Sequence, residues 1–148
     1  MRKLVSMLAA GAVLALAVSA FSGAATTKGD NTWEATLSAG QEIPKQVVKM
    51  AAAHGDFKAT LTGKKLKWTL TFQHLTGAAV AAHIHLGATG KSGNVVVPLC
   101  PPRCKSGLSG TATLTSALIA DFGKHLLYVN VHTAKNPAGE IRGQLRKG

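Results

Sequence analysis

Apolar and polar residues alternate at every second position along several stretches of this chain. Between Leu66 and Phe72, apolar residues stand at 66, 68, 70 and 72, and polar residues stand at 67, 69 and 71. Such alternation places the apolar side chains on one face of an extended strand, whereas an amphipathic helix repeats about every 3.6 residues. The same alternation over 57–61, followed by a turn at 63–65, predicts a β-hairpin.

Several other short segments show the strand pattern. We expect strands at 33–37, 94–99, 110–115, 126–132 and 140–145. One short helix is expected over 117–122, because Thr115 or Ser116 can cap its first turn and Gly123 can end it. Short strands separated by turns are typical of all-β folds. We therefore predict an all-β Greek-key β-sandwich or barrel with one short helix, with Trp33, Trp68 and Phe72 in its core.

The first residues of the chain predict export. Arg2 and Lys3 precede the apolar run from Leu4 to Val18, which is too short and too rich in alanine for a membrane-spanning helix. We expect residues 1–25 to be a signal peptide, with cleavage after position 20, 24 or 25 and an uncleaved anchor as the alternative. Residues 26–148 would then form one secreted or extracytoplasmic domain, with its core at about 33–145 and no membrane span.

The predicted mature chain is strongly basic. The sequence has 17 Lys and Arg against 6 Asp and Glu, so removal of Arg2 and Lys3 leaves 15 against 6, a net charge of +9. We expect these charges mainly to form solvated faces, with attraction to anionic polymers of the cell envelope as the alternative. Because the lysines are scattered, without clustered arginines and aromatic platforms, we expect no nucleic-acid partner.

The two cysteines, Cys100 and Cys104, stand at the ends of the segment CPPRC. In an exported chain the expected outcome is a disulfide, and a pair of thiolate metal ligands is the alternative. A loop this short contributes only about 2 kcal/mol by loop entropy. The bond is therefore expected to shape the loop more than it stabilises the domain.

Three histidines are placed on polar strand faces by the same alternation. His83 and His85 flank Ile84, so their rings project from one face with Cα atoms about 7 Å apart. His132 lies on the polar face of the strand whose apolar positions are 127, 129 and 131. Two ligands from one strand and a third from another suit copper, or alternatively zinc. The alternative is that all three are ordinary exposed or hydrogen-bonded histidines.

The remaining chemistry is sparse. His74 continues the inward register of the strand before it and is expected at the core margin, while His125 begins a strand beside the end of the predicted helix. The sequence offers no paired-carboxylate or Ser-His-Asp spacing, so we assign no catalytic residue.

Two long segments resemble one known family. The segment 81–99, with AAHIHLG and GNVVVPL, resembles the centre of the CHRD domain, the module named after chordin. The segment 128–145, with YVNVHTA and NPAGEIRGQL, resembles its C-terminal signature, and 35–44, with ATLS and QEIP, resembles its opening. The resemblance covers about 33–145. Single-domain bacterial members are secreted, which implies a binding module of the cell envelope or extracellular space.

A more distant similarity concerns the histidines alone. The pattern His83-x-His85, with a later Val-His at His132, is similar to the copper-ligand pattern of Cu/Zn superoxide dismutases, which implies that these three residues are copper ligands. The chain has neither a convincing bridging histidine nor a zinc-loop cluster. A metal-binding module is therefore expected, with a copper-dependent redox enzyme as the alternative. Three residues are expected to orient the ligands without binding the metal themselves: Asn130, Glu140 and Arg142.

Overall fold

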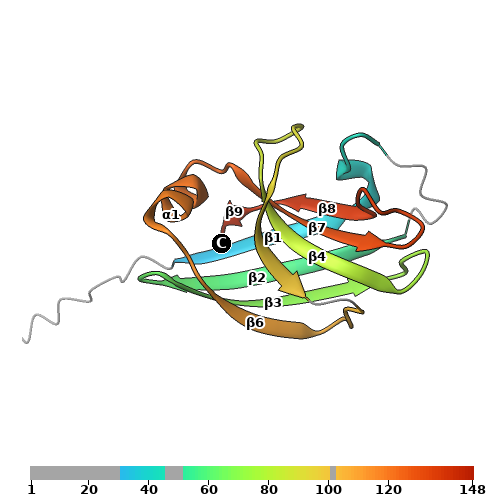
Figure 1. Cartoon of the computed structure of the whole chain (residues 1–148), viewed down its shortest axis with the longest axis horizontal. Coiled ribbons are helices and arrows are strands. Elements are labelled where there is room, and N and C mark those ends of the chain that lie inside the picture. Colours follow the sequence, from blue (N-terminus) through green and yellow to red (C-terminus); the bar gives the residue numbers. More distant parts are fainter. Residues whose placement is uncertain (1–30, 46–51, 101–102) are drawn as a thin grey trace, which may run out of the picture.

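The computed structural model describes residues 31–45, 52–100 and 103–148, and the predicted signal peptide lies outside these ranges. The fold is mostly β, with one α-helix in the described residues (Figure 1). In chain order, the elements are β1 (Thr32–Ser38), the 3-10 turn η1 (Ala39–Gln41), β2 (His54–Thr62), β3 (Lys65–Gln73), β4 (Ala79–Leu86), β5 (Val95–Cys100), β6 (Leu108–Thr113), α1 (Ser116–Gly123), β7 (Leu127–Thr133), β8 (Ile141–Gln144) and β9 (Arg146–Lys147).

The strands form one antiparallel sheet that curls into a nearly closed barrel. Their order is β5-β4-β7-β8-β1-β2-β3-β6, and the short β9 pairs with β1. Several spatial neighbours are far apart in sequence, because β4 pairs with β7, β1 with β8 and β3 with β6. The end strands β5 and β6 approach each other, which brings the sheet close to closure. The predicted Greek-key β-sandwich or barrel is confirmed.

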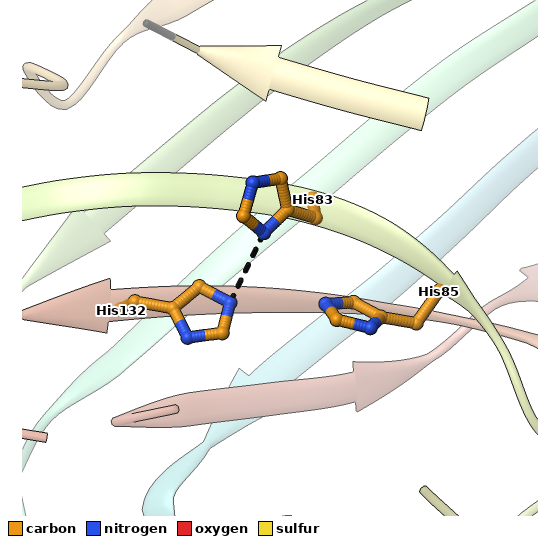
Figure 2. Close-up of side chains that lie close together, drawn as sticks. All are labelled: His83, His85 and His132. Carbon is orange, nitrogen blue, oxygen red and sulfur yellow. Dashed lines mark hydrogen bonds between the residues drawn. The ribbon is translucent and has the colours of Figure 1, made fainter. Parts of the chain in front are cut away.

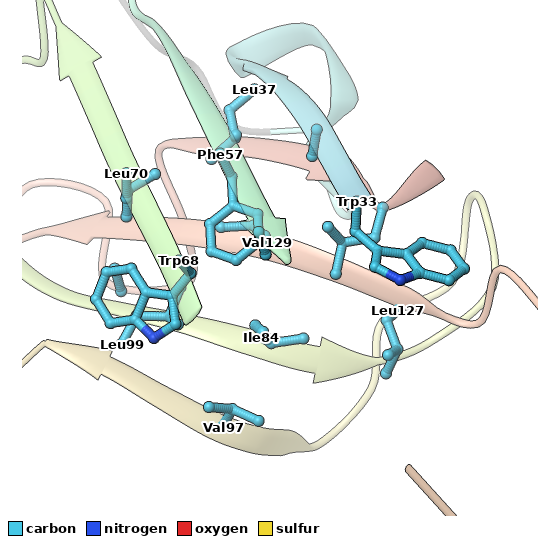
Figure 3. Close-up of a cluster of buried hydrophobic side chains, with 14 of the residues drawn as sticks. Trp33, Leu37, Phe57, Trp68, Leu70, Ile84, Val97, Leu99, Leu127 and Val129 are labelled. Carbon is cyan, nitrogen blue, oxygen red and sulfur yellow. The ribbon is translucent and has the colours of Figure 1, made fainter. Parts of the chain in front are cut away.

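The hairpin of β2 and β3 follows the predicted register. Along both strands buried and exposed residues alternate without interruption, and Gly63 in the connecting turn has a positive φ of 59°. The core lies between this side of the barrel and the side formed by β4, β5 and β7 (Figure 3). Trp33, Trp68 and Phe72 are buried, as the alternation predicts.

Helix α1 lies where the sequence predicts and is one residue longer at each end, since it includes Ser116 and Gly123. The backbone N–H of Leu118 donates to the Thr115 hydroxyl at 3.2 Å, so Thr115 caps the first turn. The buried Phe122 ring lies 5.2 Å from the Trp33 ring, which joins the helix to the core. Across the described ranges, no helix is both long and apolar enough to cross a membrane.

Cys100 and Cys104 are joined as a disulfide, with their Cα atoms 5.8 Å apart. Cys100 ends β5 and pairs with Ala82 of β4, while Cys104 forms an isolated bridge with Ala79 at the start of β4. The small loop therefore fastens the end of β5 to the strand that carries two of the histidines.

Candidate metal centre

The adjacent strands β4 and β7 bring the three predicted histidines together. In the antiparallel register, Ala81 pairs with His132 and His83 pairs with Asn130, so His83, His85 and His132 project from the same side of the sheet. Figure 2 shows their rings turned toward one another. One ring nitrogen from each residue lies within 4.8 Å of the others. The Nδ1 atom of His83 and the Nε2 atom of His132 are 3.2 Å apart.

Hydrogen bonds to backbone carbonyls fix the orientation of two of these rings. The Nδ1–H of His85 donates to the carbonyl of Gly93 at 2.9 Å, and the Nδ1–H of His132 donates to the carbonyl of Pro137 at 3.0 Å. In a neutral imidazole the other nitrogen then carries a lone pair. The Nε2 atom of His85 is buried and has no hydrogen-bond partner among the described residues. Two lone pairs therefore point into the cluster.

Burial keeps the three imidazoles neutral. Polar strand faces predict a site at the surface, but His85 and His132 are each only 8% exposed and His83 is half-buried, so the site is largely enclosed. Burial, together with the nearby His83 and His85, lowers the pKa of His132 to about 4, although its bond to Pro137 opposes the shift. Burial also lowers the pKa values of His83 and His85. Neutral rings are the form that binds metal ions.

The comparison with protein families matches residues 33–145 to the CHRD domain. The chain belongs to the CHRD family. No curated protein and no solved structure matches it. The matched region contains every strand except β9 and the first residue of β1, and it includes all three clustered histidines of this CHRD domain.

The polar face of β7 in this CHRD domain is covered, which the alternation pattern did not predict. Every residue of β7 is buried, on the polar side as well as on the apolar side. Loop 87–93, which follows β4, covers part of this face, because its backbone accepts hydrogen bonds from Arg142 and Gln144 of β8. The side chain of Ser92 in the same loop donates to the carbonyl of Ile43 at 3.0 Å.

Arg142, which was expected to support the ligands, contacts the Tyr128 ring and loop 87–93. It is 3% exposed, and its guanidinium carbon lies 3.5 Å from the centroid of the Tyr128 ring. Its Nη2 donates to the carbonyls of Lys91 and Ala88. The guanidinium charge is therefore shielded from solvent, and the side chain fixes the backbone of loop 87–93.

Glu140 is held by a hydrogen-bond network of its own. Its carboxylate accepts hydrogen bonds from the hydroxyls of Thr76 and Thr133, from the backbone N–H of Thr76 and from the amide of Asn136. Burial raises the pKa of Glu140, but these hydrogen bonds outweigh it, so the net pKa is lowered. Glu140 thus joins the segment after β3 to the turn between β7 and β8.

A buried acid that sequence reasoning missed lies against Asn130, the cross-strand partner of His83. Glu42, which follows η1, is 1% exposed, and its Oε2 accepts a hydrogen bond from Asn130 at 3.4 Å. Burial raises the pKa of Glu42 to about 7, although Arg142 and Asn130 act in the opposite direction. Glu42 lies in the opening segment of the family signature, but no alternation or spacing marks its side chain as buried.

The remaining histidines lie outside the cluster. His74 was expected at the core margin, but it is exposed because β3 ends at Gln73 and His74 turns away with φ of 56°. His125 is exposed after α1, with its ring 6.2 Å from that of Trp33. The alternation that turns His83 and His85 to the polar side places Leu86 on the apolar side, but Leu86 is 39% exposed because β4 ends there.

Proposed function

We propose that this chain is an exported binding module that holds a copper or zinc ion through His83, His85 and His132. The observation that carries the proposal is the buried Nε2 of His85, which has no partner in the described residues although its ring is fixed by Gly93. A buried polar atom without a partner is costly unless a ligand or ion satisfies it.

The spacing of the nitrogens supports a shared ion. Ligands about 2 Å from a tetrahedral ion are separated by about 3.3 Å. The His83 and His132 nitrogens are already 3.2 Å apart, and the largest separation in the cluster is within 4.8 Å. Small rotations of the rings therefore suffice to complete the site. Imidazole suits both copper and zinc, so donor type alone leaves both metals as candidates.

Metal analysis of the purified protein tests the proposal. We expect copper or zinc at one ion per chain, and we expect titration of the metal-free protein with each ion to shift the ring signals of all three histidines. His132→Ala should abolish stoichiometric binding, while His74→Ala, at an exposed position outside the cluster, should not. Absence of copper and zinc binding by the folded protein would reject the proposal.

A copper-dependent redox enzyme is the second candidate. Catalytic metal sites commonly combine three protein ligands with an open position, and His83, the half-buried member of the cluster, lies on its accessible side. Superoxide and peroxide turnover by the copper-loaded protein would support this candidate, and its absence would favour binding alone. Export is tested separately, by the location and mass of the processed chain in the producing cell.

A further partner of this module is proposed to be an anionic polymer of the envelope. Lys58, Lys65 and Lys67 are exposed on the outer face of β2 and β3, where cross-strand neighbours are mostly threonines. Retention on a polyanion that falls with added salt would support this attraction, because exposed charges are screened by salt.

A further inference from the structure

Side chains of β8 fix the backbone of loop 87–93. Arg142 Nη2 donates to the Lys91 carbonyl at 2.8 Å and to the Ala88 carbonyl at 3.4 Å. Gln144 Nε2 donates to the Gly87 carbonyl at 3.0 Å. All three acceptors are backbone carbonyls, so this network constrains the path of the loop itself.

Tyr128 connects the same arginine to a histidine of the cluster. The His85 ring stacks on the Tyr128 ring, with centroids 4.8 Å apart and planes 9° from parallel. The Arg142 guanidinium carbon lies 3.5 Å from the centroid of that tyrosine ring, a favourable position for a cation on an aromatic face. Arg142 therefore contacts both the loop and the ring that supports His85.

Gly93 completes the connection between the loop and His85. Its carbonyl accepts the Nδ1–H of His85 at 2.9 Å, and its backbone N–H donates to the Tyr128 hydroxyl at 3.2 Å. A Cβ atom at Gly93 would lie 1.5 Å from the carbonyl oxygen of Leu86, so only glycine allows the loop to return this close to β4. The position of the Gly93 carbonyl decides which nitrogen of His85 carries the proton.

We propose that Arg142 is a positioning residue: by holding loop 87–93 and the Tyr128 ring, it keeps the His85 proton on Nδ1 and leaves Nε2 directed at His83 and His132. The effect on metal affinity rests on the proposed function, whereas the state of His85 is a property of the protein without metal. Lysine cannot replace arginine in this role, because it lacks the planar guanidinium that stacks on a ring while donating sideways to carbonyls.

The test compares Arg142→Lys with Arg146→Lys, a matched change at an exposed arginine of β9. In the metal-free protein, nitrogen NMR of the histidine rings should show His85 in the Nδ1–H form alone. We expect Arg142→Lys to populate both forms of His85 and to weaken copper binding by about 10-fold to 100-fold, the usual effect of losing a group that orients a ligand. Arg146→Lys should match the unsubstituted protein in both measurements.

The outcomes separate the two proposals. If Arg142→Lys leaves His85 in a single form, the positioning role is wrong. If the unsubstituted protein binds no metal but Arg142→Lys changes the state of His85, the proposed function fails and the positioning role stands. Should Arg142→Lys not fold, Arg142→Gln provides the test, because its shorter amide cannot stack on the Tyr128 ring and also reach the Lys91 and Ala88 carbonyls. An unchanged His85 in that variant would overturn the inference.

Discussion

The Nδ1 atom of His83 lies 3.2 Å from the Nε2 atom of His132, although the two residues are 49 positions apart. Because the Nδ1–H of His132 donates to Pro137, its Nε2 is an acceptor, and the proton between the two rings belongs to His83. An ion bound by both atoms needs a lone pair on each. The proton on His83 Nδ1 must therefore leave that atom when metal binds.

We accordingly predict that metal binding changes the tautomer of His83 and of no other histidine in the cluster. His83 should pass from the Nδ1–H form to the Nε2–H form, whereas His85 and His132 should keep their protons on Nδ1 because Gly93 and Pro137 accept them. Nitrogen NMR of the rings with and without zinc measures this directly. A His83 that stays protonated on Nδ1 in the zinc-loaded protein would exclude it as a ligand through that atom.

Removal of one ligand should weaken metal binding severely. We predict that His132→Ala lowers copper affinity by more than about 100-fold, since loss of a group that merely orients a ligand already costs 10-fold to 100-fold. His125→Ala is the matched control, because His125 is exposed after α1 and outside the cluster. Calorimetric titration of both variants measures the difference, and equal affinities would contradict a site that includes His132.

The pH dependence of copper binding should follow the lowered pKa values. Ordinary imidazoles, with pKa near 6.5, would lose copper below about pH 6 because protonated rings cannot ligate. Burial lowers the pKa of His132 to about 4, so this ring stays neutral at pH 6, and it lowers the pKa values of His83 and His85 as well. We predict strong binding at pH 6 and loss as pH falls toward 4. Affinity that has already collapsed at pH 6 in the titration series would contradict this.

Much of this fold follows from local pattern. The alternation around Trp68 predicts its strand, its buried face and its hairpin partner, because a strand's period of two is a property of neighbouring residues. The helix is also predicted from neighbouring residues, because Thr115 can cap its first turn and Gly123 can end it. The pairing of β4 with β7 is not local. Alternation places His83 and His132 on polar strand faces, but their shared site could be predicted only with the help of the family resemblance.

The enclosure of the site could not be predicted from alternation. Alternation places Tyr128, Asn130 and Arg142 on a polar face, but it does not reveal that loop 87–93 and Glu42 lie over that face. Those contacts depend on where a loop without periodicity folds back. The burial of Glu42 and the role of Arg142 therefore emerge only from the three-dimensional arrangement.

The disulfide between Cys100 and Cys104 should contribute little to global stability. The loop that it closes is short, and the loop-entropy relation gives about 2 kcal/mol for it. We predict that the double variant Cys100→Ala, Cys104→Ala folds to the same barrel and loses no more than about 2 kcal/mol in urea unfolding. Failure of the variant to fold would show that the fastening of β5 to the start of β4 is essential.

The buried Glu42 should make the protein less stable as pH rises. Its pKa is about 7 in the folded protein, against 4.5 for an ordinary glutamate. Between these values the folded state binds more protons than the unfolded state, so the free energy of unfolding falls as pH increases across that window. We predict that Glu42→Gln, which does not titrate, gains stability relative to the unsubstituted protein from pH 4 to pH 8. The gain should be at most about 3 kcal/mol.

Glu140→Gln is the matched control, because hydrogen bonds from Thr76, Thr133 and Asn136 lower the pKa of Glu140 in the folded protein despite the opposing effect of burial. Ionisation of Glu140 stabilises the fold above its unfolded pKa, and this stabilisation is lost as pH falls through the lowered value. Glu140→Gln should therefore lose stability relative to the unsubstituted protein over the same rise in pH, opposite in sign to Glu42→Gln. Urea unfolding at pH 4, 6 and 8 measures both differences, and subtraction from the unsubstituted protein removes the contribution of the histidines. A difference for Glu42→Gln that stays constant with pH would show that Glu42 ionises in the fold as it does in the unfolded chain.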